Sequence, residues 1–311
     1  MRAVTPAALD AINYTFSLAF QRGLVSAETF YAKIVSEMPS VGRENRYAWL
    51  DRLPAMREWL GERVIQNASA REFTVVNKNY EETVRVDRNQ IEDDQVGVFS
   101  PVVEMLGYAV KVLPDQLTTS LILSGESTLC HDGQYFFDTD HPLDMDDSGS
   151  ATQANLLTSL PLTEANYATA RAQMRSFKGK DGTPLNINPT VLMVHPDQEG
   201  IARKILTGEF IPSTVTQGAV SGAAAGTNIW KGSADLIVNP YLTTTGEWYL
   251  LDCSKPIKPF VYQKRRPAQL VPMTDPSSPE VFKNRQFLWG VDSREAAGLG
   301  LYFLALKCKP S

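Results

Sequence analysis

Thiol, imidazole and carboxylate side chains gather between residues 130 and 141, and these groups bind metal ions or transfer protons in enzymes. They suggest a metal-dependent hydrolase in which His131, Asp138 and His141 hold the ion. The whole set is Cys130, His131, Asp132, Asp138, Asp140 and His141.

The sequence around this set is typical of a structural loop. Residues 128–158 contain Asp-Gly, Asp-His-Pro and Asp-Asp-Ser-Gly-Ser, which favour turns and provide no helix or strand to fix ligand geometry. His195 lies in a strand-to-helix turn before Pro196, and the three cysteines form no CxxC pair. We therefore expect no catalytic, cofactor-binding or metal-binding residues.

Sequence motifs of the common catalytic classes are missing. The chain has neither a P-loop pattern nor GxGxxG, so a nucleotide site is not indicated. It also lacks HExxH and GxSxG, which removes the support for a zinc protease or a serine hydrolase.

Composition indicates a folded protein with a sizeable core. The chain has 311 residues, 43% of them hydrophobic, which suits one large or two ordinary domains. Its net charge of −5 disfavours a surface built to grip nucleic acid. The few cysteines indicate a reducing compartment, and no apolar run predicts a secretion signal or a membrane span.

The N-terminal 60 residues are expected to be helical. Thr5-Pro6 is a good helix start, and a second helix is expected between Ser26 and Pro39. Residues 45–60 suit two short helical turns joined at Pro54.

Residues 62–91 predict a long β-hairpin. Strands at Val64-Ile65, Phe73–Val76 and Thr83–Val86 are separated by turn formers at 67–69 and 77–79. Its many charged side chains fit either a solvated hairpin or an arm that reaches over a neighbouring molecule.

The strongest helical pattern runs from Ser100 to Gly125, with apolar residues every three or four positions. Such a helix would be roughly 35–40 Å long. Pro114 lies inside it and is expected to kink or break it.

The C-terminal half predicts an α/β unit followed by strands. Thr163 is expected to cap a helix, Thr190–Val194 to form a buried strand, and Pro196 to open another helix. Residues 213–228 have the composition of a flexible loop. Further strands are expected at Asp235–Val238, Trp248–Leu251 and Pro259–Tyr262, with a closing antiparallel pair at 281–291 and 300–307 that flanks a turn at 292–295.

Several segments of this chain also carry the patterns of a known family. They are Trp49-Leu50 with Pro54, Arg57–Arg63, Tyr80–Asp87, Ile91–Gln95, Phe137–Pro142 and Arg285–Leu306. These segments, in this order, resemble the major head subunits of Mu-type tailed phages and prophages. That family has the α+β capsid fold of the Hong Kong 97 type.

The resemblance implies a division of the chain into five parts. They are an N-terminal helical arm (1–44), an extended β-hairpin loop (45–92), a peripheral domain with a long spine helix (93–186), an axial α/β domain (187–275), and the closing strands of the peripheral domain (276–311).

It also implies a structural protein that assembles with itself into pentamers and hexamers of an icosahedral head around double-stranded DNA. Scaffold, portal and decoration proteins are the other implied partners, without a membrane or a cofactor. The protein would be made in the host cytoplasm and reside in the virion. Residues expected to contact neighbouring subunits are Trp49, Arg57, Glu58, Trp59, Glu62, Arg63, Glu81, Glu82 and Arg85.

Two alternatives remain open at this point. An encapsulin-like compartment would share the fold but hold proteins instead of DNA. The metal-dependent hydrolase would use the loop histidines described above.

Overall fold

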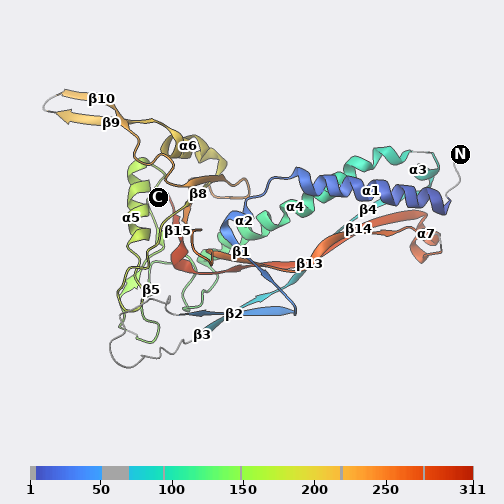
Figure 1. The fold of residues 1–311 in the computed structure, drawn as a ribbon, viewed down its shortest axis with the longest axis horizontal. Coiled ribbons are helices and arrows are strands. Elements are labelled where there is room, and N and C mark those ends of the chain that lie inside the picture. Colours follow the sequence, from blue (N-terminus) through green and yellow to red (C-terminus); the bar gives the residue numbers. More distant parts are fainter. Residues whose placement is uncertain are drawn as a thin grey trace.

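The structure, a computed structural model, describes residues 5–50, 70–93, 95–147, 149–217, 220–275 and 277–310. The chain divides into a compact body and an elongated part, here called the wing, that extends from one side of the body (Figure 1). The N-terminal end of helix α1 lies near the far tip of the wing, and the C-terminus lies in the body.

The wing consists of two long helices on a twisted sheet. The sheet has strand order β1-β13-β14-β4, in which β1 and β13 are parallel and the other pairs antiparallel. Both helices share an apolar core with Phe287 and Trp289 of the sheet. The elements are α1 (Pro6–Ser26), α4 (Ser100–Leu123), β1 (Val35–Pro39), β4 (Lys78–Asp87), β13 (Phe260–Met273) and β14 (Gln286–Leu299).

Local sequence explains where the two helices begin and end. The Thr5 hydroxyl accepts a hydrogen bond from the Ala8 amide, and Pro6 opens α1, as predicted. Helix α4 has the predicted bounds to within two residues and continues through Pro114, so the helix does not break there. Proline removes one backbone hydrogen bond, and the packing of α4 against α1 and the sheet outweighs that loss.

Two glycines let α1 and α4 approach each other closely. A Cβ atom at Gly107 would overlap the backbone carbonyl oxygen of Phe20, and one at Gly23 would overlap that of Glu104. Only glycine permits backbones at this distance, so the crossing is specified by these two positions.

The body is built around a five-stranded mixed sheet with order β11-β8-β12-β15-β7. Central strands β8 and β12 are buried along their whole length, which explains their unbroken apolar sequences. Helices α5 and α6 and the end of α4 contribute to the same core. The elements are α5 (Glu164–Arg175), α6 (Glu199–Thr207), β7 (Leu156–Leu157), β8 (Val191–Val194), β11 (Asp235–Val238), β12 (Trp248–Leu251) and β15 (Ala305–Cys308).

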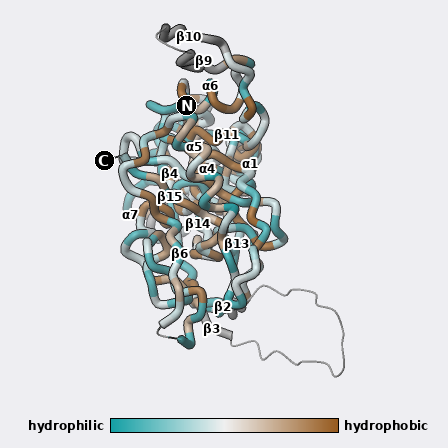
Figure 2. The backbone as a smooth tube through the Cα atoms, turned by 90° about the vertical axis from the view of Figure 1, so that its left-hand side faces the viewer, coloured by the Kyte–Doolittle hydropathy of each residue, from teal (hydrophilic) through white to brown (hydrophobic). Residues whose placement is uncertain are grey.

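Two hairpins project from the body, β2–β3 at one end and β9–β10 at the other (Figure 1). Between these two ends, the segments coloured as hydrophobic lie mainly in the middle of the molecule (Figure 2). The remaining elements are short: α2 (Tyr31–Ile34), β2 (Glu44–Leu50), β3 (Ala70–Val76), α3 (Arg88–Glu92), η1 (Gln95–Val98), η2 (Ser124–Glu126), β5 (His141–Pro142), β6 (Thr152–Gln153), η3 (Pro196–Gln198), β9 (Phe210–Gln217), β10 (Val220–Thr227), α7 (Pro279–Asn284) and η4 (Tyr302–Leu304).

Two predictions of helix near the N-terminus are wrong. Between Ser26 and Pro39 only four residues are helical, and the chain then becomes strand β1, because β13 offers it a parallel partner. Residues 45–50, predicted as part of a helical turn, belong to strand β2, because β3 offers them an antiparallel partner along their whole length. Residues 51–60 lie outside the described part of the chain.

The predicted hairpin of residues 62–91 is paired differently from the prediction. Strands β3 and β4 exist as expected, but β3 pairs with β2, and β4 pairs with β14. Asn77 therefore links two sheets instead of forming a hairpin turn; its side-chain amide donates to Ser40 Oγ at 2.7 Å. Val64-Ile65 lies outside the described residues.

Two predictions in the C-terminal half also need correction. The glycine-rich segment 213–228 is mostly strand, because β9 and β10 satisfy each other's backbone groups without needing a core. Residues 292–295, predicted as a turn, lie within the single strand β14, which has partners on both sides. Strand β15 belongs to the body's sheet, so the predicted closing pair does not form.

Candidate functional site

Residues 130–141, here called the histidine–aspartate loop, lie against the body, where the short strand β5 pairs with β6. His141 is completely buried, and its ring stacks on Tyr302 with centroids 3.7 Å apart and planes 3° from parallel. His141 Nδ1 lies 2.5 Å from Asp132 Oδ2, and His141 Nε2 lies 3.1 Å from Asn155 Oδ1. The loop is therefore packed against the body and hydrogen-bonded to it, so the turn-rich sequence does form a structural loop.

Asn155 and Asp132 hold the two ring nitrogens of His141. The Asn155 Nδ2 amide donates to the carbonyl oxygens of Phe136, Tyr302 and Ala305, so Oδ1 is the acceptor side. Asn155 Oδ1 therefore faces His141 Nε2, and the Asp132 carboxylate faces Nδ1, so both sides of the buried ring meet an oxygen of a neighbouring side chain.

The pKa of Asp132 reflects this pair. Burial tends to raise the pKa of the carboxyl, but the hydrogen bond and the charge of His141 outweigh burial and hold the pKa below its usual range. The contact with Asp132 and the stacking on Tyr302, at the start of η4, thus tie the loop to the body.

This geometry rejects the metal-dependent hydrolase. Because Asp132 and Asn155 occupy both nitrogens of the buried His141, neither nitrogen is accessible to a metal ion. Asp138 Oδ1 accepts from the Thr139 amide at 2.8 Å, and His131 Nδ1 lies 3.1 Å from Cys130 Sγ. Within the described residues, no cluster of three or more potential ligands has the geometry to hold a metal ion.

The remaining candidate reactive groups have structural surroundings. His195 Nδ1 accepts a hydrogen bond from the Asp197 amide at 3.2 Å and so caps η3. Burial raises the pKa of the Cys253 thiol to about 12 and raises the pKa of Cys130 and Cys308 as well. Thiols of this kind are not nucleophilic near neutral pH.

The predicted contact residues fall into two groups. Glu81, Glu82 and Arg85 lie exposed on β4 of the wing, and the backbone of Trp49 pairs with Arg71 in the β2–β3 hairpin. The structure therefore places β4 and the hairpin on different surfaces. Arg57, Glu58, Trp59, Glu62 and Arg63 lie outside the described residues.

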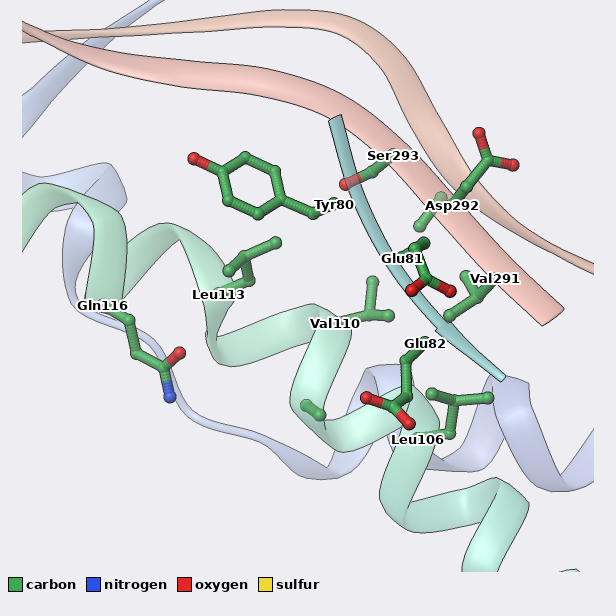
Figure 3. Close-up of a pocket in the computed structure, with 12 residues that line it drawn as sticks. Tyr80, Glu81, Glu82, Leu106, Val110, Leu113, Gln116, Val291, Asp292 and Ser293 are labelled. Atoms are coloured by element: carbon green, nitrogen blue, oxygen red, sulfur yellow. The ribbon is translucent and has the colours of Figure 1, made fainter. Parts of the chain in front are cut away.

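A groove that the sequence did not reveal runs between α4 and the strands β4 and β14 (Figure 3). It has a volume of about 220 Å³ and an apolar floor formed by Leu106, Val110, Leu113 and Val291. Glu81, Glu82 and Asp292 lie around its rim. One feature of the sequence could have indicated the groove. Tyr80, Val84 and Val86 lie on the side of β4 that faces the helices, and Glu82, on the same side, is a charged residue among them.

Comparison with known proteins gives a single answer over the whole chain. The sequence matches the family of the Mu-like prophage major head subunit gpT over residues 9–160, 152–242 and 243–311. The chain belongs to this family. It is 29% identical over 306 residues to the major capsid protein of Escherichia phage Mu, covering 98% of this chain and 75% of that protein. It is 30% identical over 305 residues to the Mu-like prophage FluMu major head subunit of Haemophilus influenzae, covering 98% and 74% respectively.

Solved capsid structures share the fold. The procapsid of bacteriophage JBD30 is similar with a TM-score of 0.62 and 29% identity, covering 99% of this chain and 77% of the JBD30 chain. The JBD30 capsid gives a TM-score of 0.53 at 22% identity, covering 98% and 73%. A virus-like particle from Pyrococcus furiosus gives 0.51 at 10% identity, covering 95% and 98%, which shows only a shared fold.

These matches confirm the predicted fold class and the main functional prediction. The chain has the α+β capsid fold of the Hong Kong 97 type and is a major head subunit, a structural shell protein of phage virions and not an enzyme. It assembles with copies of itself, as a shell requires. In the part of the chain that the structure describes, no helix is long and apolar enough to cross a bilayer.

Proposed function

We propose that this head subunit forms pentamers and hexamers that close into an icosahedral shell around phage double-stranded DNA. The match to head subunits along nearly the whole sequence is the observation that carries the proposal. Ring contacts are heterologous, because one patch of a subunit meets a different patch of the next. A net charge of −5 suits a container wall that does not hold its DNA tightly.

The five parts anticipated from the sequence supply a division of labour for this shell. In our proposal, the wing, with its long helix α4, serves as the peripheral domain with its spine helix, and the body serves as the axial domain. Residues 1–44 serve as the N-terminal arm, 45–92 supply the extended loop, and 276–311 complete both parts, with β14 in the wing and β15 in the body.

The extended loop would lie across a neighbouring subunit. The β2–β3 hairpin projects from the body, and its sequence continues into Arg57, Glu58, Trp59, Glu62 and Arg63, a mixture of charge and aromatic surface suited to fixing register. Trp49, on β2, would anchor the base of this contact.

Scaffold, portal and decoration proteins would be the other partners. A capsid of bacteriophage JBD30, similar in fold at a TM-score of 0.51 and 21% identity, is decorated with minor capsid protein trimers. In our proposal the subunit is made in the host cytoplasm and assembles there. An encapsulin-like role has no comparable support, because the particle from Pyrococcus furiosus shares only the fold.

Expression of the full chain with its scaffold tests the shell. Negative-stain microscopy and sedimentation should reveal closed particles of uniform size. Replacing Arg57 and Arg63 together by glutamate should reduce particle yield by about tenfold or more while leaving the circular dichroism of the subunit unchanged. Discrete monomers or dimers under every condition would count against the shell, and recovery of particles filled only with an enzyme would count against DNA as the cargo.

A further inference from the structure

The sheet of the wing has two free edges. Strand β4 ends the order β1-β13-β14-β4, so its outer edge pairs with no described strand. On the other side, β1 covers only Phe260 to Lys264 of β13, and the rest of that strand has no outer partner among the described residues. Unpaired edges invite association, and proteins control them with charge, proline and bulges.

The β4 edge is acidic where it borders the groove. Glu82 occupies a helix-facing position, yet it is exposed because the groove opens there beside Leu106 and Val110. Its carboxylate makes no ion pair with any described residue, and neither does that of Glu81. Carboxylates beside an apolar floor favour a partner that brings both a cation and an aliphatic stem.

The β13 edge is basic and irregular. Lys264, Arg265 and Arg266 are consecutive exposed cations at a point where the pairing with β14 shifts register. Arg265 has no opposing residue in β14, so it lies in a bulge that turns side chains away from the regular ladder. Arg266 is paired with Asp292, whereas Lys264 and Arg265 make no ion pair with a described residue.

The two patches lie at neighbouring levels of the wing. Lys264 is opposite Glu295 of β14, and Glu81 and Glu82 are opposite Asp292 and Val291, three and four residues before Glu295. At about 3.4 Å per residue, the offset along the strands is roughly 10–14 Å. They lie on opposite edges of the three-stranded ribbon, so they cannot meet within one subunit.

We propose that the basic bulge of one subunit, Lys264 and Arg265, docks against the acidic groove of a second copy, at Glu81 and Glu82. This inference rests on the proposed ring assembly and names one of its contacts. The lysine and arginine stems lie over Leu106 and Val110 while their charges meet the two carboxylates. Two acidic edges repel each other, so the contact forms head to tail, which is the arrangement that closes rings.

Charge reversal tests this contact with the full chain expressed alongside its scaffold. Glu81→Lys with Glu82→Lys, and separately Lys264→Glu with Arg265→Glu, should each lower the assembled fraction by about tenfold or more in sedimentation velocity. Combining all four substitutions should restore assembly to within about threefold of the unmodified chain, because the attraction is regained with its direction reversed. Circular dichroism confirms that each variant folds.

A matched control changes the same charge elsewhere. Arg175→Glu with Lys178→Glu alters two exposed cations of the body that make no ion pair with described residues, and it should leave assembly unchanged. If both wing reversals assemble like the control, the docking is wrong. If each double reversal blocks assembly and the variant with all four substitutions does not regain assembly, the patches bind something other than each other, such as scaffold or DNA. The docking is then equally wrong.

Disulfide trapping gives an independent result. Glu82→Cys and Arg265→Cys subunits, mixed and assembled, should form covalent dimers that neither variant forms alone. The native thiols compete poorly, because Cys130 and Cys308 are buried in the body and burial raises the pKa of the partly exposed Cys253 to about 12. Shells that assemble without these dimers would overturn the docking and leave the shell proposal intact. A chain that never forms rings would contradict both proposals.

Discussion

The body and the wing are stabilised in different ways. In the body, charged side chains are buried and paired: Lys307, only 2% exposed, lies 2.7 Å from Glu126 and 2.8 Å from Glu247. In addition, the Tyr249 hydroxyl donates to the Glu247 carboxylate at 3.0 Å. This network joins the end of α4 to strands β12 and β15.

The wing relies on apolar packing and leaves part of it uncovered. Its helices meet through Gly23 and Gly107, and large apolar side chains remain exposed on its outer surface: Tyr14 at 68%, Met105 at 63% and Phe282 at 81%. The body is thus stabilised in part by buried charged pairs, whereas the exposed apolar residues of the wing provide surface that other molecules can cover.

Removing the Lys307 ammonium is the strongest test of the difference between the body, with its buried charge network, and the wing. Lys307→Met keeps the stem but leaves the buried Glu247 without its cation, next to the partly exposed Glu126, so the free energy of unfolding should fall by about 3–5 kcal/mol. Urea denaturation of the unassembled subunit measures the loss.

Lys309→Met is the matched control, because Lys309 also contacts Glu126 but is partly exposed. Its cost should stay below about 1 kcal/mol. Equal costs for the two variants would mean that the buried network does not distinguish the body from the surface.

A second buried pair allows the same comparison to be followed with pH. Because the pKa of Asp132 in the folded state lies below its unfolded value, the ionised carboxylate stabilises the fold above about pH 4, and this contribution disappears as pH falls through the folded pKa. Asp132→Asn should therefore cost about 1.5–3 kcal/mol at pH 7. The difference from the unmodified chain should narrow at pH 3.

Asp10→Asn, on the exposed face of α1, provides the control and should show no such pH-dependent difference. A cost for Asp132→Asn that stays constant from pH 7 to pH 3 would contradict an ionised Asp132 that the contact with His141 stabilises.

The sequence predicted those elements whose signals are local. The bounds of β11 and β12, the Thr163 cap of α5 and the length of α4 follow from short apolar runs between turn residues, from capping and from periodicity within each segment. The family's motifs then supplied the capsid fold, which no single element implies.

The errors occur where a distant partner decides the conformation. Residues 292–295 read as a turn because Asp and Ser favour turns, yet β13 and β4 hold them extended from both sides. The role of His141 depends on Asn155 and Tyr302, which lie 14 and 161 residues away in the sequence. The spacing of residues 130–141 therefore could not predict those contacts.

Adding one methyl group to the wing tests how closely its helices pack. In Gly107→Ala the new Cβ atom meets the backbone of Phe20 in α1, so the helices must separate. Overpacking costs about 1–3 kcal/mol, partly offset by the better helix propensity of alanine, and we expect a net loss of about 1–2 kcal/mol. Hydrogen exchange should show faster opening of α1 while the body's strands β8 and β12 stay protected.

Gly200→Ala is the counterpart in the body. Gly200 lies in α6, and a Cβ atom added there would meet no other atom within 4 Å, so the same change should stabilise the protein by up to about 1 kcal/mol. Opposite signs for the two substitutions would follow from one physical difference, because only in the wing does a glycine bring two helix backbones into contact. If both variants were stabilised alike, α1 would be held loosely on α4, and the wing would owe its shape to neighbouring subunits instead of its own packing.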